Sequence, residues 1–386
     1  MTLLSQKNID FSDHKKFFDD PLMGALRVLS SKNTDLYVNG DRIPFCARNK
    51  VARQFFGAIL KACTVGNFSL PTATVSQIDA VVEADAAFTP EQCFWVPTSG
   101  RHHAFKKKRL QKQVFALLSD IFNYKKFCDG IGWELSDNQL RQVKMRDRGS
   151  KWGADEYLSL LIKENNLRFC PYCNAETTFM LKGLTNSKGE SLSPFDHFYP
   201  KTAFPYLGVS LCNLIPCCAH CNSSMKGDKL PFSGGKRWPN PYEDDFNELA
   251  RFKYVGDPLP ALLGSGNGGL TVGIDCSYKS TVDTWGFVNK MNIVEKYNQA
   301  HSVEINELPA RVACIFMRAP SLLDDLLKRE RSLSLINYVL NCSLDDRNIH
   351  KERLSKMTMD LLDDLGCMDE LIALKRVWGE AKRTMF

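Results

Sequence analysis

The residues best suited to chemistry in this sequence are two Cys-x-x-Cys pairs with an Asp–His pair between them. The first pair is Cys170 and Cys173 in "FCPYC", and the second is Cys218 and Cys221 in "PCCAHC". Two intervening residues allow a tight turn to point both thiolates at one ion, and two such turns make a tetrahedral four-sulfur site. The sequence therefore predicts a structural zinc ion bound by these four cysteines.

The ligands from the second pair are harder to identify, because other residues that can bind zinc lie next to it. Cys217 adjoins Cys218, and His220 can replace a cysteine as a zinc ligand. The spacing favours Cys218 and Cys221, and Cys212 is expected to be a core residue. The alternative for the whole set is a group of unligated, buried cysteines. A zinc ion with four protein ligands has no open position, so it stabilises structure and does no chemistry.

Asp196 and His197, in "SPFDHFYPK", are the candidates for chemistry between the two pairs. A carboxylate is a hard oxygen ligand for a divalent cation, and a histidine can accept a proton from water near neutral pH. Neighbours on a regular strand point to opposite faces, although a strand end relaxes this rule. Asn213 and Asn222 are candidates for a second metal ligand and for a group that orients the imidazole. In isolation, the Asp–His pair is better explained as an ordinary surface pair.

The pattern "CPYC … DHFYPK … NLIPCCAHCNSSMKG" resembles the motif of the HNH, or His-Me finger, endonucleases. The resemblance implies a ββα-metal module, in which two antiparallel strands and a helix hold one catalytic cation. It implies that His197 is the general base, that Asp196 and Asn222 hold Mg²⁺ or Mn²⁺, and that Asn213 holds the loop and orients His197. Asn222 occupies the position of the last histidine in the HNH motif. The implied products are 5′-phosphate and 3′-hydroxyl ends.

Two lysines close to the motif are candidates for binding a substrate phosphate. Lys226 lies four residues after Asn222, which is about one helical turn. Lys201 directly follows Pro200. A lysine ammonium contacts phosphate as a point charge. The alternative for each is a solvated surface lysine.

Composition indicates a soluble, cytoplasmic protein. The chain has 386 residues, and this length favours two or three domains. No apolar run reaches the roughly 18–20 residues of a membrane span, and the N-terminus lacks the features of a signal peptide. Without a secretory signal, disulfides are not expected among the 14 cysteines, so the clustered Cys-x-x-Cys pairs indicate metal ligands, and most of the eight cysteines scattered elsewhere are expected to be buried apolar residues. The net charge of +6 and the basic stretches at 101–112 and 141–151 suit an anionic partner such as DNA.

The predicted elements form a mostly helical α+β fold in three regions. Residues 1–155 are expected to be an α+β region that binds the target or a partner, 156–240 the HNH module with its zinc site, and 241–386 a mainly helical region. Apolar spacing predicts the helices, and Asn39-Gly40 between strand formers predicts a hairpin. The expected helices are 51–63, 77–88, 110–127, 155–166, 287–317, 321–340, 351–365 and 368–383; the hairpin is 35–45, and two strands are 250–256 and 269–276.

Residues 238–257 and 281–302 are similar to the tails of HNH proteins from bacterial anti-phage systems, the Septu and retron-associated nucleases. This similarity implies a nuclease effector that works with an ABC-type ATPase, with the C-terminal helices as a docking surface. The alternative is that those helices only pack on the nuclease core.

The sequence therefore predicts a metal-dependent HNH endonuclease that cuts DNA in phage defence. Two other hypotheses remain open. One is a non-cleaving zinc-knuckle module that binds nucleic acid or protein, although such a module has no use for Asp196, His197 and Asn222 together. The other is an HNH toxin or recombination nuclease with the same chemistry and a different partner.

Overall fold

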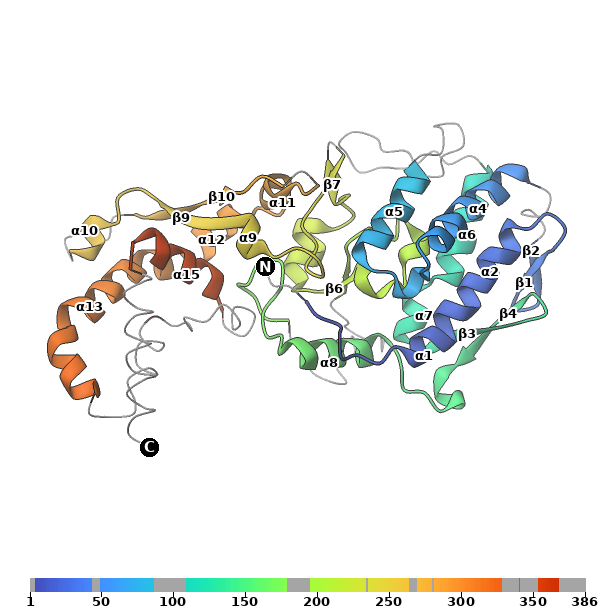
Figure 1. Cartoon of the computed structure of the whole chain (residues 1–386), viewed down its shortest axis with the longest axis horizontal. Coiled ribbons are helices and arrows are strands. Elements are labelled where there is room, and N and C mark those ends of the chain that lie inside the picture. Colours follow the sequence, from blue (N-terminus) through green and yellow to red (C-terminus); the bar gives the residue numbers. More distant parts are fainter. Residues whose placement is uncertain are drawn as a thin grey trace.

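The computed structural model describes residues 4–43, 49–86, 109–178, 195–233, 235–263, 269–279, 281–327, 340 and 353–367. These residues form an α+β fold in which helices predominate and the sheets are small. Figure 1 shows an elongated arrangement, with the N-terminal helices at one end, the C-terminal helices at the other, and β6 (Leu214–Pro216) and β7 (Phe232–Ser233) between them. Buried apolar side chains form one cluster that extends from Ile9 to Leu362. Among the described residues, no helix combines the length and apolar character that crossing a bilayer requires.

The N-terminal region packs its helices on one another and on a small sheet. In the helix after Asp19, buried Leu22, Leu26 and Leu29 recur at helical spacing and form its core-facing side. The predicted helix at 51–63 is confirmed, and the side chain of Asn49 caps its N-terminus. The helical elements here are α1 (Ser12–His14), η1 (Lys15–Asp19), α2 (Asp20–Ser30), α4 (Lys50–Val65), η2 (Leu70–Thr72), α5 (Val75–Ala86), α6 (Arg109–Ile121) and α7 (Tyr124–Cys128).

The single helix predicted at 110–127 is wrong, because the chain forms two helices, α6 and α7. Asn123 separates them, and its side chain accepts hydrogen bonds from the amides of Lys125 and Lys126. An asparagine at this position caps a new helix instead of continuing the old one. The helix predicted at 77–88 is α5, and residues 87 and 88 lie outside the described residues.

A four-stranded sheet with the order β2-β1-β4-β3 lies beside these helices. The predicted hairpin is confirmed, with φ of 51° at Asn39 and 93° at Gly40. A second hairpin turns at Asp137 and Asn138, and the sequence analysis missed it. The basic stretch 141–151 falls on β4 and η3, whereas residues 101–108 of the other basic stretch lie outside the described residues. The elements are β1 (Leu36–Val38), β2 (Asp41–Ile43), β3 (Ile131–Ser136), β4 (Gln139–Lys144) and η3 (Met145–Arg148).

The middle of the chain contains a two-stranded antiparallel sheet followed by a wide helical turn. Asp196 of β5 is opposite Ile215 of β6, and His197 is opposite Leu214. This strand–strand–helix order is a small ββα-like region. The predicted helix at 155–166 is confirmed. The elements are α8 (Ala154–Asn165), β5 (Phe195–His197), η4 (Pro205–Leu207), η5 (Leu211–Asn213), β6 (Leu214–Pro216), the π-helix η6 (His220–Lys226), β7 (Phe232–Ser233) and β8 (Lys236–Arg237).

The C-terminal region is built on the antiparallel pair β9 (Ala250–Val255) and β10 (Thr271–Cys276), which confirms the two predicted strands. Helix side chains bind the free edge of each strand. Asp360 and Asp364 accept hydrogen bonds from backbone amides of β9, while Asn298 bonds backbone groups of β10 and Asn306 bonds those of the residue just before β10. These contacts satisfy the edge groups that a two-stranded sheet leaves unpaired.

The prediction of one continuous helix at 287–317 is wrong, because this segment spans parts of three helices. Asn292, with φ of 49°, and His301 separate them. The helix predicted at 351–365 is the described α15. Most of the helix predicted at 321–340 and all of the one at 368–383 lie outside the described residues. The helices are α9 (Phe246–Leu249), α10 (Leu259–Leu262), α11 (Thr284–Lys290), α12 (Ile293–Ala300), α13 (Ser302–Leu327) and α15 (Ser355–Asp364).

Candidate active site and metal centre

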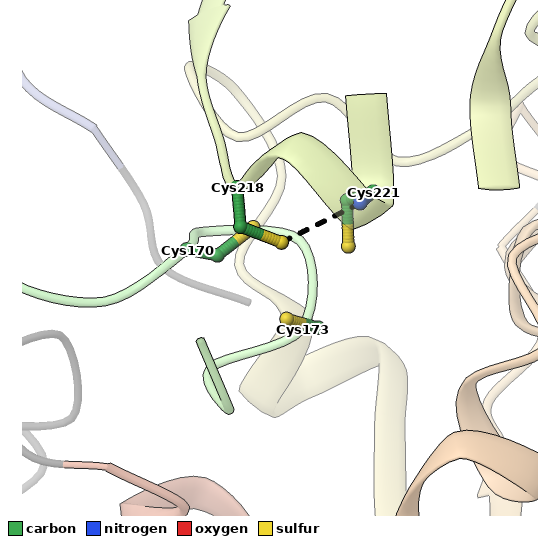
Figure 2. A group of neighbouring side chains, drawn as sticks. All are labelled: Cys170, Cys173, Cys218 and Cys221. Atoms are coloured by element: carbon green, nitrogen blue, oxygen red, sulfur yellow. Dashed lines mark hydrogen bonds between the residues drawn. The ribbon is translucent and has the colours of Figure 1, made fainter. Parts of the chain in front are cut away.

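Four cysteines, Cys170, Cys173, Cys218 and Cys221, converge on one point and are called the four-cysteine cluster below. Their sulfur atoms lie within 4.8 Å of one another, and all four residues are buried. Figure 2 shows that two of them come from a turn after α8, that Cys218 lies between β6 and η6, and that Cys221 lies in the first turn of η6. The cluster agrees with the ligand set predicted from the spacing.

The neighbouring donors considered from the sequence are not part of the cluster. Cys217 is buried but does not belong to it, and His220 is exposed to solvent. Cys212 is buried and donates to the side chain of Gln6 at 3.2 Å. The expectation that Cys212 is a core residue is therefore confirmed.

Local hydrogen bonds shape both cysteine turns. In the first, the amide of Asn174 donates to the carbonyl of Cys170 at 2.7 Å, and Asn174 takes a left-handed conformation with φ of 51°. In the second, the amide of Cys221 donates to the sulfur of Cys218 at 3.4 Å. These bonds turn the two thiols of each pair to the same side of the backbone.

The four-cysteine cluster fits a zinc ion in size and in chemistry. Zinc–sulfur bonds of about 2.3 Å in a tetrahedron separate the sulfur atoms by about 3.8 Å, so small movements within the observed spacing suffice. Hydrogen bonds with the thiols of Cys170 and Cys218 hold the pKa of Cys173 well below its usual range. The ammonium of Lys296 lies 3.4 Å from the Cys173 sulfur and adds positive charge there. A thiolate is the form that binds metal.

The carboxylate of Asp196 is buried, and both of its oxygens are hydrogen-bonded. Lys226 donates to Oδ1 at 3.0 Å, and the hydroxyl of Tyr172 donates to Oδ2 at 2.8 Å. Burial raises the pKa of Asp196, while Lys226 and Tyr172 act in the opposite direction. Tyr172 belongs to the first cysteine turn, so the four-cysteine cluster and Asp196 are joined by a direct contact.

His197 points away from Asp196, as strand alternation requires. Its Nε2 lies 2.9 Å from the carbonyl of Gly208, and its ring meets the ring of Tyr124 edge to face at 4.7 Å. Since a carbonyl can only accept, Nε2 carries the proton, and Nδ1 has the lone pair of the neutral ring. Burial lowers the pKa of His197 to about 3, and Lys201 adds to this effect. The imidazole is therefore neutral at pH 7.

Gly208 allows this contact because it has no side chain. A Cβ atom at this position would overlap the carbonyl oxygen of Phe122, just before α7. The chain at Gly208 therefore approaches the α6–α7 connection closely, beside Tyr124 and His197.

The two asparagines of the motif lie close to this strand. The side chain of Asn213 accepts from the amide of Tyr199 at 2.7 Å and donates to the carbonyls of Tyr199 and Leu207. It thus holds the loop after His197, while the His197 ring itself contacts other residues. The side chain of Asn222 donates to the carbonyl of Phe195 at 3.3 Å, one residue before Asp196.

No protein family, curated protein or solved structure matches this chain.

The two candidate phosphate-binding lysines differ in exposure. Lys226 is buried, and its ammonium also donates to the carbonyl of His197 at 2.6 Å. In this structure it is turned toward the strand and does not reach the surface. Lys201 is exposed, and its ammonium lies 5.3 Å from the centre of the Tyr124 ring, which the His197 ring also contacts.

The oxygen atoms of Asp196 and Asn222 suit Mg²⁺ or Mn²⁺ by type, because these hard cations prefer carboxylate and amide oxygens. The charges around Asp196 in this structure do not suit a divalent cation. Asp196 already has a cationic partner in Lys226, so a divalent ion fits beside this carboxylate only after the ammonium has moved.

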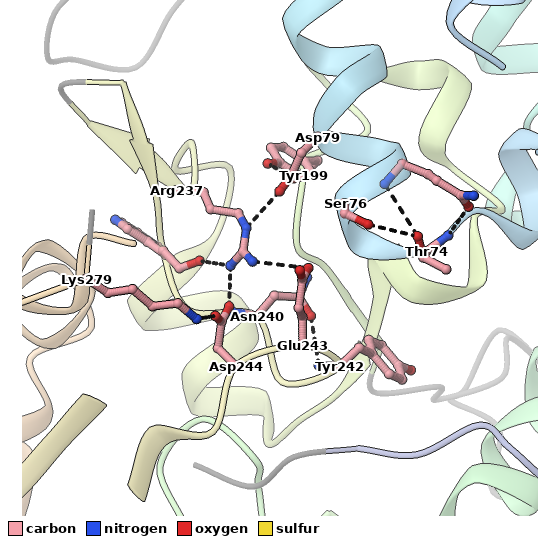
Figure 3. A network of polar contacts seen from close by, with 12 residues as sticks. Thr74, Ser76, Asp79, Tyr199, Arg237, Asn240, Tyr242, Glu243, Asp244 and Lys279 are labelled. Carbon is pink, nitrogen blue, oxygen red and sulfur yellow. Dashed lines mark hydrogen bonds and ion pairs between the residues drawn. The ribbon is translucent and has the colours of Figure 1, made fainter. Parts of the chain in front are cut away.

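A partly buried ionic network supports the loop that follows His197 (Figure 3). The hydroxyl of Tyr199 donates to Asp79 of α5 at 2.6 Å, and Arg237 pairs with the same carboxylate at 2.8 Å. Arg237 also pairs with Glu243 and Asp244. The network joins α5 to the loop that follows β5.

Sequence reasoning missed the contacts of Tyr172, Tyr124 and Gly208. Tyr172 had one usable signal, because it lies inside a cysteine turn whose position was predicted. Tyr124 and Gly208 reach the site only through tertiary packing, so no local pattern marks them.

Proposed function

We propose that this chain is a metal-dependent HNH endonuclease that hydrolyses phosphodiester bonds of DNA. The observation that carries the proposal is the β5–β6 pair followed by η6, a strand–strand–helix order that contains Asp196, His197 and Asn222 and lies beside the four-cysteine cluster. The motif resemblance supports the same assignment.

In this proposal, His197 is the general base. The Gly208 carbonyl fixes the proton on Nε2, so Nδ1 is the nitrogen that can accept a proton from water. The edge contact with Tyr124 holds the plane of the ring. The lowered pKa keeps the ring unprotonated across the neutral range, at the cost of a weaker base.

Asp196 and Asn222 would hold the divalent cation, which neutralises the charge that develops on the phosphate. Tyr172 orients the Asp196 carboxylate through Oδ2. Asn213 fixes the loop that leaves the strand, and exposed Lys201 is available to a substrate phosphate. The four-cysteine cluster would hold a structural zinc ion that keeps Tyr172 and Asn222 in place.

The test is cleavage of supercoiled plasmid by the purified, zinc-loaded chain with and without added Mg²⁺ or Mn²⁺. Nicking or linearisation is expected only with the added cation, and the nicks should be resealed by DNA ligase because they carry 5′-phosphate and 3′-hydroxyl ends. Zinc content is measured in parallel, so that loss of the structural ion is not mistaken for a cation requirement. Equal cleavage in chelator with zinc retained would rule the mechanism out.

A second candidate is a zinc-knuckle module that binds nucleic acid without cutting it. Two observations favour it: Asp196 and His197 are buried, and Asp196 is ion-paired with Lys226. Side chains in this arrangement do not contact a substrate phosphate. A plasmid that is shifted on a gel but stays supercoiled with Mn²⁺ would support this candidate.

For the biological setting, we propose a nuclease effector of a bacterial anti-phage system with an ABC-type ATPase partner. The similarity of residues 238–257 and 281–302 to Septu and retron-associated nucleases supports it. Plaque counts on bacteria that express the chain with and without a neighbouring ATPase gene test it. Protection that needs both genes and is lost in His197→Ala is expected. A toxin or recombination nuclease would give no protection.

A further inference from the structure

Asp196 and Lys226 form an ion pair that is almost fully removed from water. The side chains are 3% and 1% exposed, and the ammonium also bonds the carbonyl of His197. If the Lys226 ammonium pointed into solvent, Asp196 would be an unpaired buried carboxylate, which would destabilise the folded chain. Lys226 is therefore the cation that balances Asp196 in this structure.

The backbone around Lys226 directs it inward. Lys226 is the last residue of the π-helix η6, and the amide of Gly227 donates to the carbonyl of Asn222 at 2.7 Å, closing a turn of five residues. Such wide turns are rare and short, and they are frequently found at functional sites. Here the wide turn includes Asn222 and Lys226, so a change in either residue's contacts acts on the other through this turn.

We propose that Lys226 is a built-in competitor of the catalytic cation, and that a divalent ion binds Asp196 only by displacing the Lys226 ammonium. The inference rests on the proposed function for the role of Asp196. One buried carboxylate cannot balance a divalent ion and an ammonium a few ångströms apart, because like charges repel strongly where water is excluded. Lys226 thus lowers the affinity of Asp196 for the divalent ion and keeps the carboxylate ion-paired until that ion displaces the ammonium.

The first experiment measures Mn²⁺ binding by electron paramagnetic resonance of free Mn²⁺, with the full zinc-loaded chain. Lys226→Met keeps the apolar stem of the side chain and removes the charge, so its Mn²⁺ affinity should rise on the order of tenfold or more. Lys229→Met, a change of an exposed lysine three residues further along, should leave the affinity as in the wild type. Unchanged or weaker binding in Lys226→Met would overturn the inference.

Asp196→Asn separates failure of this inference from failure of the proposed function. If Asp196→Asn loses Mn²⁺ and Lys226→Met does not bind it more tightly, Asp196 is a metal ligand and only the competition is refuted. If Asp196→Asn binds Mn²⁺ as tightly as the wild type does, both proposals fail.

A second measurement needs no variant and covers the case in which Lys226→Met does not fold. Wild-type lysines are methylated with formaldehyde and a borohydride reagent, with and without Mn²⁺, and quantified by mass spectrometry. Lys226 should be protected without Mn²⁺ and modified when Mn²⁺ is present, while exposed Lys201 is an internal reference for reagent activity. Equal protection of Lys226 in both samples would contradict displacement.

Discussion

Each buried polar group of the candidate site has specific hydrogen-bond partners. The Asp196 carboxylate has Lys226 and Tyr172, and the His197 ring has the Gly208 carbonyl. Removing one partner of a buried group costs more than the bond itself is worth, because the remaining group stays unsolvated. Substitutions at these positions are therefore expected to act on stability as well as on chemistry.

Tyr172→Phe should destabilise the folded chain by about 1.5–3 kcal/mol, because it removes a hydrogen bond to a buried carboxylate. Urea denaturation measures the free energy of unfolding. Zinc content should not change, since the substitution leaves all four cysteines in place.

Tyr254→Phe is the matched control for this prediction. The Tyr254 hydroxyl is also buried, but it donates to the neutral carbonyl of Ile305 at 3.1 Å. Its loss should cost about 0.5–1.5 kcal/mol. A cost for Tyr172→Phe no larger than that for Tyr254→Phe would show that Tyr172 does not stabilise a charged Asp196.

His14 makes the stability of the protein depend on pH. The ring is buried against Phe18 and Phe127 and accepts a hydrogen bond from Trp152, and burial lowers the pKa of His14 to about 3. The unfolded chain takes up this proton near pH 6.5, whereas the folded chain does so only near pH 3. Stability is therefore present above pH 6.5 and is lost as the pH falls, by about 2 kcal/mol between pH 7.5 and 5.

The comparison for this prediction is His14→Gln, measured by urea denaturation at both pH values. Burial raises the pKa of Asp19 and of Asp85 to about 6, and these groups oppose the His14 effect in both proteins. The difference between the two proteins isolates His14. Parallel pH dependence in wild type and His14→Gln would show that His14 does not contribute.

Among elements, the cysteine turns are the parts that tie distant segments together. The first turn contacts the C-terminal region as well, because the amide of Leu354 donates to the carbonyl of Asn174, and Tyr297 donates to the carbonyl of Cys173. A metal ion in the four-cysteine cluster would therefore stabilise the strand pair β5–β6 and the packing of α12 and α15 at the same time.

Cys170→Ser should lose the bound zinc and unfold this part of the chain. Zinc binding by four thiolates contributes on the order of 10 kcal/mol or more in small zinc domains, which matches the whole stability of a typical domain. Elemental analysis and circular dichroism are the measurements. Cys212→Ser is the matched control, because the serine hydroxyl can keep the bond to Gln6 and the zinc should stay. Zinc retained at the wild-type level in Cys170→Ser would contradict the assignment.

Elements with a local signal were predictable from the sequence. The Asn39-Gly40 turn, the apolar face of α4 and the spacing of the cysteines each depend on residues close together in the chain. The break at Asn123 had a signal that was overlooked, since asparagine caps helices. The split of 287–317 into three helices is harder to foresee, because Asn292 and His301 interrupt an otherwise continuous helical pattern.

At the scale of the whole molecule, long-range packing limited what the sequence could show. The parallel pairing of β1 with β4 joins Tyr37 to Gln139, and no local pattern specifies such a partner. The inward direction of Lys226 has the same origin, because spacing alone places it one turn from Asn222 and does not say which way it faces. The motif located the candidate site, whereas tertiary contacts decided its charge balance.

The whole-molecule arrangement also connects the site to the N-terminal helices. Tyr199 and Tyr206, which follow His197, donate to Asp79 and Asp85 of α5. The loop after β5 is therefore held from outside the ββα-like region, and the N-terminal helices are expected to contribute to the geometry of His197.

The most direct test of the central claim is plasmid cleavage by wild type, His197→Ala and His220→Ala with Mg²⁺ or Mn²⁺. His220 is an exposed histidine on η6 and is the matched control, with zinc content and circular dichroism confirming the fold of each protein. Cleavage by wild type and His220→Ala, and its loss in His197→Ala, is the predicted result. Cleavage by folded His197→Ala at the wild-type rate would show that His197 is not the base.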